Sequence, residues 1–179
     1  MRKASSARNQ LIGMAGVYYV AAELCRRGYI ALPTSRNLRA FDLIVMDQET
    51  GRSVGVEVKT REPRKGESKV QFNVIQATGE SILYGDALEK RIKSCYVFVC
   101  LPPEEQPTFY IVPRDDVIRL VKESVEYYFE TRKHPRKTRE QILKSRYPVG
   151  PYLELLEKYK DKWELLFARG TGKEESVGE

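Results

Sequence analysis

Two apolar segments joined by a short turn constrain the fold of this chain more than any other feature. Residues 41–46 form a nearly continuous apolar run, and residues 54–60 alternate, with three valines on one face. Both patterns are typical of β-strands, because successive side chains of a strand point to opposite faces of the sheet. Between them lies Thr50-Gly51, whose glycine favours a turn. The sequence therefore predicts a β-hairpin that other elements must cover.

The rest of the chain supplies elements in an order typical of an α/β fold. Apolar residues recur every three or four positions over residues 8–28, which predicts a helix that ends at Gly28. The same reasoning predicts strands at 29–32, 95–101 and 108–112, a short strand at 69–74, and helices at 75–93, 115–132 and 152–167. This order predicts a sheet with helices on its faces.

A length of 179 residues suits one domain with its own core. We assign residues 1–132 to this core and residues 133–169 to a basic C-terminal helical extension. Residues 170–179 are small, acidic and terminal, so we expect a disordered tail there.

Charge is distributed unevenly along the chain. There are 31 Lys and Arg residues against 25 Asp and Glu, which gives a formal net charge of +6. Residues 131–146 hold seven cations and one acid, so this segment alone accounts for the whole excess. A concentrated basic segment is typical of a nucleic-acid-binding surface, although charge runs are also common on ordinary solvated faces.

Composition excludes several classes of protein. A hydrophobic content of 41% excludes wholesale disorder. The longest apolar runs are far shorter than a membrane span, and the basic N-terminus leads into no apolar signal segment, so we expect no membrane partner. The three cysteines lack CxxC spacing and lie among apolar residues, so we expect reduced core thiols in a cytoplasmic protein. The one histidine, His134, rules out a His-rich metal site.

The hairpin carries the residues best suited to chemistry. If it turns on Thr50-Gly51, Asp42 lies opposite Lys59 and Glu57 lies diagonally across, all on one face. Two carboxylates and an ammonium beside a core are costly unless compensated. A hard divalent cation would offset that cost, activate water and hold a phosphoryl oxygen, while the lysine stabilises developing charge. The alternative is a cross-strand Asp–Lys ion pair with an exposed glutamate.

These residues resemble a known family. Phe41-Asp42-Leu43-Ile44-Val45 and Val56-Glu57-Val58-Lys59-Thr60 look like the PD-(D/E)XK nuclease superfamily. The stretches Gly13-Met14-Ala15-Gly16 and Arg27-Gly28-Tyr29 resemble archaeal Holliday-junction resolvase-like proteins, and residues 96–101 and 109–113 fit small uncharacterised endonuclease-like proteins. The resemblance covers residues 11–132 and implies a restriction-endonuclease-like αβββαβ core with a mixed central sheet flanked by helices.

The resemblance also implies functional residues. Asp42, Glu57 and Val58 would form the site for Mg²⁺ or Mn²⁺, and Lys59 would be the catalytic lysine. Many relatives place a glutamate where this chain has Val17. Glu23 is a nearby acid, with metal support or a surface salt bridge as its alternative roles, and Gln76 stands where some relatives carry a glutamine at the start of a helix.

Basic side chains near the motif are candidates for binding DNA phosphates, with ordinary solvation as the alternative. They are Arg36, Arg39, Arg61, Arg64 and Lys65, joined by Arg136, Lys137 and Arg139 of the basic segment. We expect Tyr18 and Tyr19 to pack in the core or in a dimer, with base stacking as the alternative.

The leading hypothesis is a metal-dependent DNA endonuclease that hydrolyses phosphodiester bonds. Its narrower form acts on branched or structured DNA, which implies a homodimer presenting two sites. One alternative is a catalytically weak or inactive nucleic-acid-binding module on a nuclease fold. Another is an interaction domain whose basic face binds an acidic protein.

Overall fold

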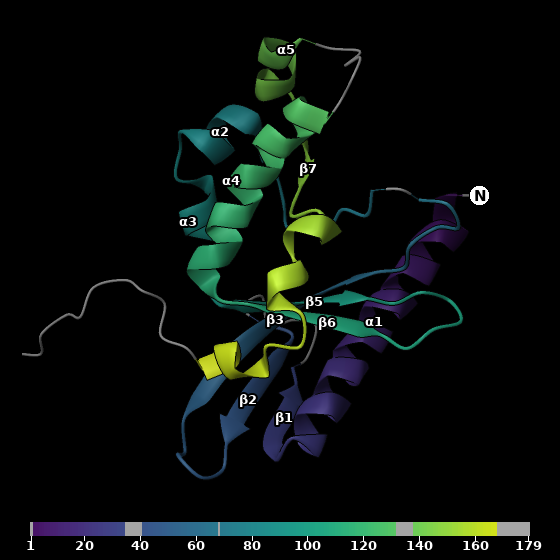
Figure 1. Ribbon diagram of the computed structural model, residues 1–179, viewed down its shortest axis with the longest axis vertical. Coiled ribbons are helices and arrows are strands. Elements are labelled where there is room, and N and C mark those ends of the chain that lie inside the picture. The colour runs from purple at the N-terminus through teal and green to yellow at the C-terminus, as the bar shows by residue number, and fades with distance from the viewer. Residues whose placement is uncertain (1, 35–40, 68, 132–137, 168–179) are drawn as a thin grey trace, which may run out of the picture.

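A five-stranded mixed sheet forms the centre of the molecule in the computed structural model, which describes residues 2–34, 41–67, 69–131 and 138–167 (Figure 1). Its strand order is β1-β2-β3-β5-β6. The strands β3 and β5 are parallel, and the other neighbours are antiparallel. Their bounds are Tyr29–Pro33 for β1, Leu43–Asp47 for β2, Ser53–Arg61 for β3, Cys95–Cys100 for β5 and Thr108–Val112 for β6. The predicted α/β fold is confirmed.

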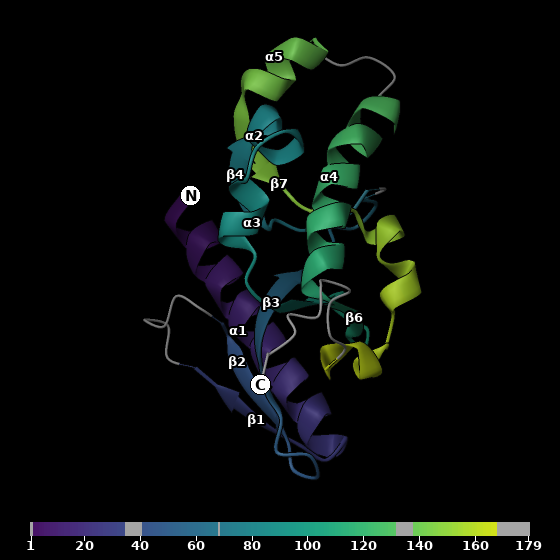
Figure 2. The same ribbon diagram turned by 90° about the vertical axis from the view of Figure 1, so that its left-hand side faces the viewer.

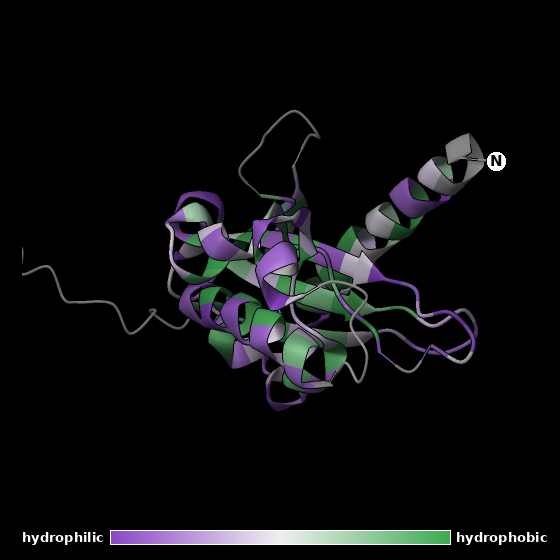
Figure 3. Ribbon diagram, turned by 90° about the horizontal axis from the view of Figure 1, so that it is seen from above, coloured by the Kyte–Doolittle hydropathy of each residue, from purple (hydrophilic) through white to green (hydrophobic). Residues whose placement is uncertain are grey.

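Helices cover the two faces of this sheet. On one face α1 (Arg2–Arg26) buries Val20 and Leu24 against the valines of β2 and β3. The other face packs against α4 (Arg114–Thr131), as Figures 1 and 2 show. The strand β5 serves both cores, because its alternate side chains belong to different clusters and all six are buried. The N-terminal turns of α1 project away from the rest of the molecule (Figure 3).

The segment predicted as one helix over residues 75–93 is instead a strand and two short helices. These are β4 (Ile75–Thr78), α2 (Gly79–Leu83) and α3 (Ala87–Arg91). Thr78 accepts a hydrogen bond from the Ser81 N–H and so caps α2. The strand β4 pairs with β7 (Arg146–Val149), which follows α5 (Arg139–Lys144). Local periodicity did not reveal this pairing, because the partner strand lies far along the chain.

Two other predicted elements differ from the structure. Residues 69–74 form no regular strand, although Phe72 and Val74 are buried and their N–H groups donate to residues 151 and 149. The helix predicted over residues 152–167 is three 3-10 turns: η1 (Leu153–Leu155), η2 (Glu157–Tyr159) and η3 (Trp163–Phe167). The chain passes from one core to the other between Tyr159 and Trp163, and Asp161 takes a left-handed φ of 53° there. A continuous helix cannot make that turn.

The predicted hairpin forms, but its register differs by two residues. Leu43 lies opposite Val56, whereas a turn centred on Thr50-Gly51 would place it opposite Val58. The Asp47 carboxylate accepts hydrogen bonds from the N–H groups of Glu49 and Thr50, which shifts the centre of the turn back by one residue. A shift of two residues keeps every side chain on its predicted face.

The cysteine prediction is right for two residues and wrong for the third. Cys95 and Cys100 are buried free thiols, and burial raises the pKa of Cys95 to about 12. Cys25 is exposed on the last turns of α1. None of the helices in the described residues is long and apolar enough to cross a membrane.

Close packing of α1 on β3 generates the first prediction. A Cβ at Gly16 would overlap the side chain of Thr60, whereas one at Gly13 would meet nothing within 4 Å. We expect Gly16→Ala to lower the free energy of unfolding by about 1–3 kcal/mol through overpacking. Gly13→Ala should raise it by up to about 1 kcal/mol, because alanine is the better helix former. Urea unfolding followed by circular dichroism measures both, and equal effects would contradict this packing.

Candidate active site

An open strand edge organises the site. The strand β2 begins at Leu43, opposite Val56, but β3 continues to Arg61 and remains paired with β5 on its other side. Residues 57–61 therefore have one edge that β2 does not cover. Asp42 lies where the two strands separate, and its N–H donates to the Val56 carbonyl at 2.9 Å.

The Asp42 side chain continues the ladder in place of a backbone carbonyl. Its Oδ2 accepts a hydrogen bond from the Val58 N–H at 2.8 Å. The N–H and C=O of one strand residue point to the same side, so the Val58 carbonyl also faces this edge. Asp42 is thus held on the edge of β3 that carries the other motif residues.

Glu57 and Lys59 are both on β3, and their side chains share one face of the sheet because they are two residues apart. The Lys59 ammonium and the Glu57 carboxylate are 2.6 Å apart, with side chains 28% and 24% exposed. Tyr96 lies directly across from Glu57 on β5. Burial raises the pKa of Tyr96, and the negative charges of Glu57 and Asp42 add to that effect. The structure therefore brings the carboxylates of Asp42 and Glu57 to one side of the sheet, but it pairs Lys59 with Glu57 instead of with Asp42.

The carboxylates of Asp42 and Glu57 and the Val58 carbonyl offer a small set of oxygen ligands of the kind that a hard divalent cation prefers. Among the described residues, the second oxygen of each carboxylate makes no hydrogen bond or ion pair. Mg²⁺ commonly takes one or two carboxylates and completes its shell with water and substrate phosphate. No group of three or more His, Cys, Asp or Glu residues in the described ranges could hold a metal ion. A cation here would rely on Asp42, Glu57 and the Val58 carbonyl, with water or substrate completing the shell.

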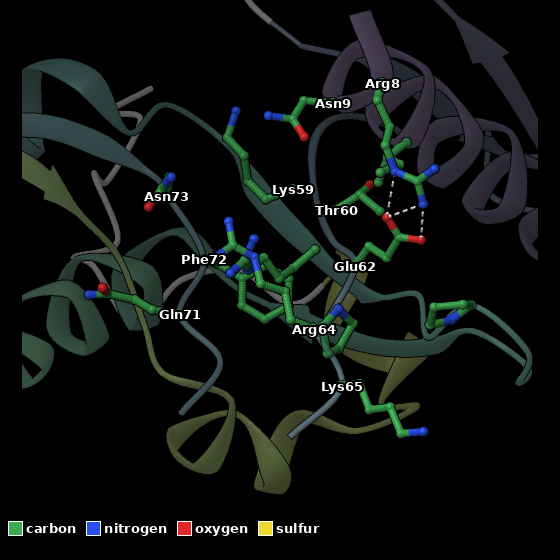
Figure 4. A pocket seen from close by; sticks show the side chains of 14 residues that line it. Arg8, Asn9, Lys59, Thr60, Glu62, Arg64, Lys65, Gln71, Phe72 and Asn73 are labelled. Atoms are coloured by element: carbon green, nitrogen blue, oxygen red, sulfur yellow. Dashed lines mark hydrogen bonds and ion pairs between the residues drawn. The ribbon is translucent and has the colours of Figure 1, made fainter. Parts of the chain in front are cut away.

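Two clefts flank the open edge, and Lys59 lines both. The first, which we name the basic cleft, has a volume of about 640 Å³ and lies between the start of α1 and the loop after β3 (Figure 4). The second, the apolar cleft, has a volume of about 380 Å³ and lies between α1 and the start of β2. Asp42 lines the apolar cleft together with Met14 and Tyr18.

Cations of the basic cleft differ in their partners. Arg8 forms an ion pair with Glu62 at 2.7 Å, which Figure 4 shows, and Arg61 forms one with Glu67 at 2.7 Å. The second oxygen of Glu67 accepts the backbone N–H of Arg64 at 2.9 Å. This backbone bond, followed by the Arg61 guanidinium, keeps the pKa of Glu67 below its ordinary value. Glu67 thereby fixes the loop that carries Arg64 and Lys65.

Arg64 and Lys65 are the cations of this cleft best placed for a new partner. Both are exposed, and within the described residues neither forms an ion pair. The amides of Asn9 and Asn73 line the same cleft (Figure 4). The cleft, which Lys59 also lines, therefore offers two unneutralised cations and the amide groups of Asn9, Asn73 and Gln71.

The remaining predicted residues lie elsewhere or outside the described part. Arg36, Arg39, Arg136 and Lys137 fall outside the described residues. Arg139 forms an ion pair with Glu126 at 2.7 Å and lies over the Phe129 ring, holding α5 against α4.

The two residues predicted as accessory to the site, Glu23 and Gln76, have other contacts. Glu23 forms ion pairs with Arg26, the last residue of α1, and with Arg27, the residue that follows it. Gln76 is on β4 and lines a separate pocket that contains none of Asp42, Glu57 and Lys59.

Sequence reasoning missed Arg8, Asn9, Asn73 and Tyr96. Arg8 and Asn9 lie far before Asp42, Glu57 and Lys59 in the sequence, and the path of α1 brings them to the basic cleft. Tyr96 lies opposite Glu57 because β3 and β5 pair in parallel. The continuous apolar run over residues 95–101 predicts a strand but does not specify its partner or its register. Val17, at the position where the resemblance implies an acid, does line the apolar cleft with Asp42.

Comparisons with known proteins give little direct information. No protein-family model and no curated protein matches the chain. Among solved structures, a bacterial homing endonuclease, I-Ssp6803I, matches with 15% sequence identity and a TM-score of 0.46, covering 87% of this chain and 88% of that chain. A similarity of this size does not assign an activity.

The hydrogen bond between Asp42 and Val58 generates the second prediction. Asp42→Ala leaves the buried Val58 N–H without its acceptor and should lower the free energy of unfolding by about 1–3 kcal/mol. Asp42→Asn keeps an oxygen acceptor and should cost less. Thermal unfolding of the two variants measures the difference, with Glu104→Ala, at an exposed position in the loop between β5 and β6, as a control that should leave stability almost unchanged. Equal losses for the alanine and asparagine variants would contradict this role of Asp42.

Proposed function

We propose that this protein is a metal-dependent DNA endonuclease of the PD-(D/E)XK type. One observation carries the proposal: Asp42, Glu57 and Lys59 gather on an uncovered edge of β3, between two clefts that both include Lys59. Exposed cations line one of these clefts. Phosphodiester hydrolysis needs this combination of oxygen ligands, a positively charged group and a basic approach surface.

Each group has a role in the proposed reaction. Asp42, Glu57 and the Val58 carbonyl would hold Mg²⁺ or Mn²⁺, which supplies Lewis-acid chemistry and an activated water when bound. Arg64 and Lys65 would contact phosphates beside the scissile bond and orient the strand. The Lys59 ammonium would leave Glu57 for the scissile phosphate, where it stabilises the charge that develops in the transition state. Asp42 stays aligned throughout by its bond to the backbone of β3.

Cleavage assays test this function. We expect Asp42→Asn and Lys59→Ala each to reduce Mg²⁺-dependent cleavage by about a hundredfold or more, the loss typical of removing a group that stabilises transition-state charge. Chelation of the metal should abolish cleavage. Glu154→Gln and Lys162→Ala, exposed residues that line neither cleft, serve as controls and should cleave normally.

The choice of substrate tests the narrower form of the proposal. Linear duplex, single-stranded and four-way branched DNA are compared, with sedimentation to determine the oligomeric state. Faster cleavage of branched DNA by a homodimer would support a junction resolvase. Full cleavage by both catalytic variants would contradict the nuclease assignment altogether.

A second candidate function is a catalytically weak DNA-binding module. Val17 favours it, because this residue lines the cleft beside Asp42 and offers no oxygen to a metal. Such a module would bind DNA with strong salt dependence but would not nick it in Mg²⁺.

Adding an acid at position 17 separates the two candidates. Metal affinity rises with the number of charged ligands, so Val17→Glu should lower the Mg²⁺ concentration needed for half-maximal cleavage. The exposed Ala22→Glu on the same helix controls for the added charge. Titration of cleavage with Mg²⁺ measures the effect. Identical titrations for the two variants would place residue 17 outside the metal site.

A further inference from the structure

We propose that the apolar cleft is a nucleobase subsite, which takes one unstacked base of the DNA strand whose phosphate lies at Lys59. This inference rests on the proposed nuclease function and names the form of DNA that the site would prefer. This cleft has an aromatic residue, Tyr18, on one wall and adjoins the basic cleft at Lys59.

The first wall comes from the exposed side of α1. Tyr18 is 59% exposed and Met14 is 36% exposed, and both line the cleft. Neither residue belongs to a core cluster, so of the two kinds of packing expected for Tyr18 from sequence, in the core or in a dimer, the core is excluded. An aromatic ring beside a methionine offers a flat apolar surface, which is the kind of surface on which nucleic-acid bases stack.

The opposite wall is held in place by backbone and ring packing. The Phe41 ring lies so close to Gly55 that a Cβ there would overlap it. Thr34 ties this segment to the end of β1, because its hydroxyl donates to the Phe41 carbonyl at 2.5 Å and its N–H donates to the Asp42 carbonyl at 2.9 Å. Contacts within the protein therefore fix the described residues of this wall, Thr34, Phe41 and Asp42, opposite Tyr18.

Size and polarity favour a base over a larger group. A volume of about 380 Å³ is near the lower end of the usual range for small-molecule sites. Its described walls combine apolar residues with four polar or charged ones, Gln10, Thr34, Asp42 and Lys59. Small sites of this kind bind a flat ligand by apolar contact and orient it with a few hydrogen bonds.

The position of Lys59 links this cleft to the phosphate path. Lys59 lines both clefts, and among the described residues that line them the exposed cations, such as Arg64 and Lys65, belong to the basic cleft. A strand with its phosphate at Lys59 would run along Arg64 and Lys65 on one side and have the apolar cleft on the other. A base enters such a cleft only after leaving the stack, and this costs least when the base is mismatched or unpaired. The site would therefore prefer DNA with an unpaired nucleotide beside the scissile phosphate.

Binding measurements with a matched pair of tyrosine variants test the proposal. Tyr19 is the control, since it adjoins Tyr18 on α1 and is 45% exposed but does not line the cleft. Fluorescence anisotropy in EDTA compares a labelled duplex carrying one unpaired 2-aminopurine with the fully paired duplex. The wild-type protein and Tyr19→Ala should bind the bulged duplex about tenfold more tightly, which is within the effect of one base–aromatic stack. Tyr18→Ala should lose this preference, and Tyr18→Trp should retain it.

The fluorescence of the unpaired base gives a second readout. It should be quenched on binding to the wild-type protein and to Tyr19→Ala, but not on binding to Tyr18→Ala. Preference and quenching that survive in Tyr18→Ala would overturn the proposal. A change from dimer to monomer in Tyr18→Ala, with DNA preference unaltered, would also overturn it, because a second copy of the chain would then occupy the cleft.

These outcomes are distinct from failure of the nuclease function. Cleavage that depends on Asp42 and Lys59 but is the same in the two tyrosine variants would overturn only the base subsite. A preference that depends on Tyr18, with no cleavage in any metal, would support the subsite and overturn only the nuclease assignment.

Discussion

The hydrogen bond from the Val58 N–H to the Asp42 carboxylate determines how the candidate site is built. Residues 57–61 of β3 continue beyond the start of β2, so β2 does not pair with this part of the edge. Asp42 accepts a hydrogen bond from one donor of that edge, and the side chains of Glu57 and Lys59 beside it stay partly exposed. A side chain in this position performs a structural and a chemical role at once, because the same carboxylate that completes the ladder has a second oxygen directed elsewhere. The placement of Glu57 and Lys59 matters only because this edge stays open.

The charged side chains near this edge of β3 are distributed unequally between the two clefts. Helix α1 crosses β3 closely at Gly16, and the two clefts lie along it, one lined near its start and the other further on. Glu62 and Glu67 neutralise the arginines that hold the loop after β3, so Arg64 and Lys65 remain for an external anion. Lys59 lines both clefts, so the proposed phosphate path and the proposed base subsite meet at this residue.

Much of the central fold could be predicted from sequence because its signals are local. The alternation over residues 54–60 and the periodicity over residues 8–28 depend only on neighbouring residues. The strand forms close to its predicted bounds, and the helix ends near its predicted end but begins earlier, at Arg2. Prediction failed for segments whose secondary structure depends on contacts with residues far away in the sequence. The strand β4 forms because β7 pairs with it, and the last segment breaks into 3-10 turns because it joins two separate cores. The register of the hairpin depended on the hydrogen bonds that the Asp47 side chain makes within the turn, and a centre estimated from Thr50-Gly51 missed it.

The sequence by itself determined which residue types could share a face and therefore which chemistry was available. Asp42, Glu57 and Lys59 lie on one face for any register shift of two, since side chains alternate with a period of two. Only the tertiary structure decided that Glu57, and not Asp42, pairs with Lys59, and that Asp42 binds the backbone of β3. It also decided that Tyr18 lines a cleft and that Arg8 and Asn9 face the loop after β3. These contacts join residues far apart in sequence, and the packing of α1 against the sheet specifies them, not any local pattern.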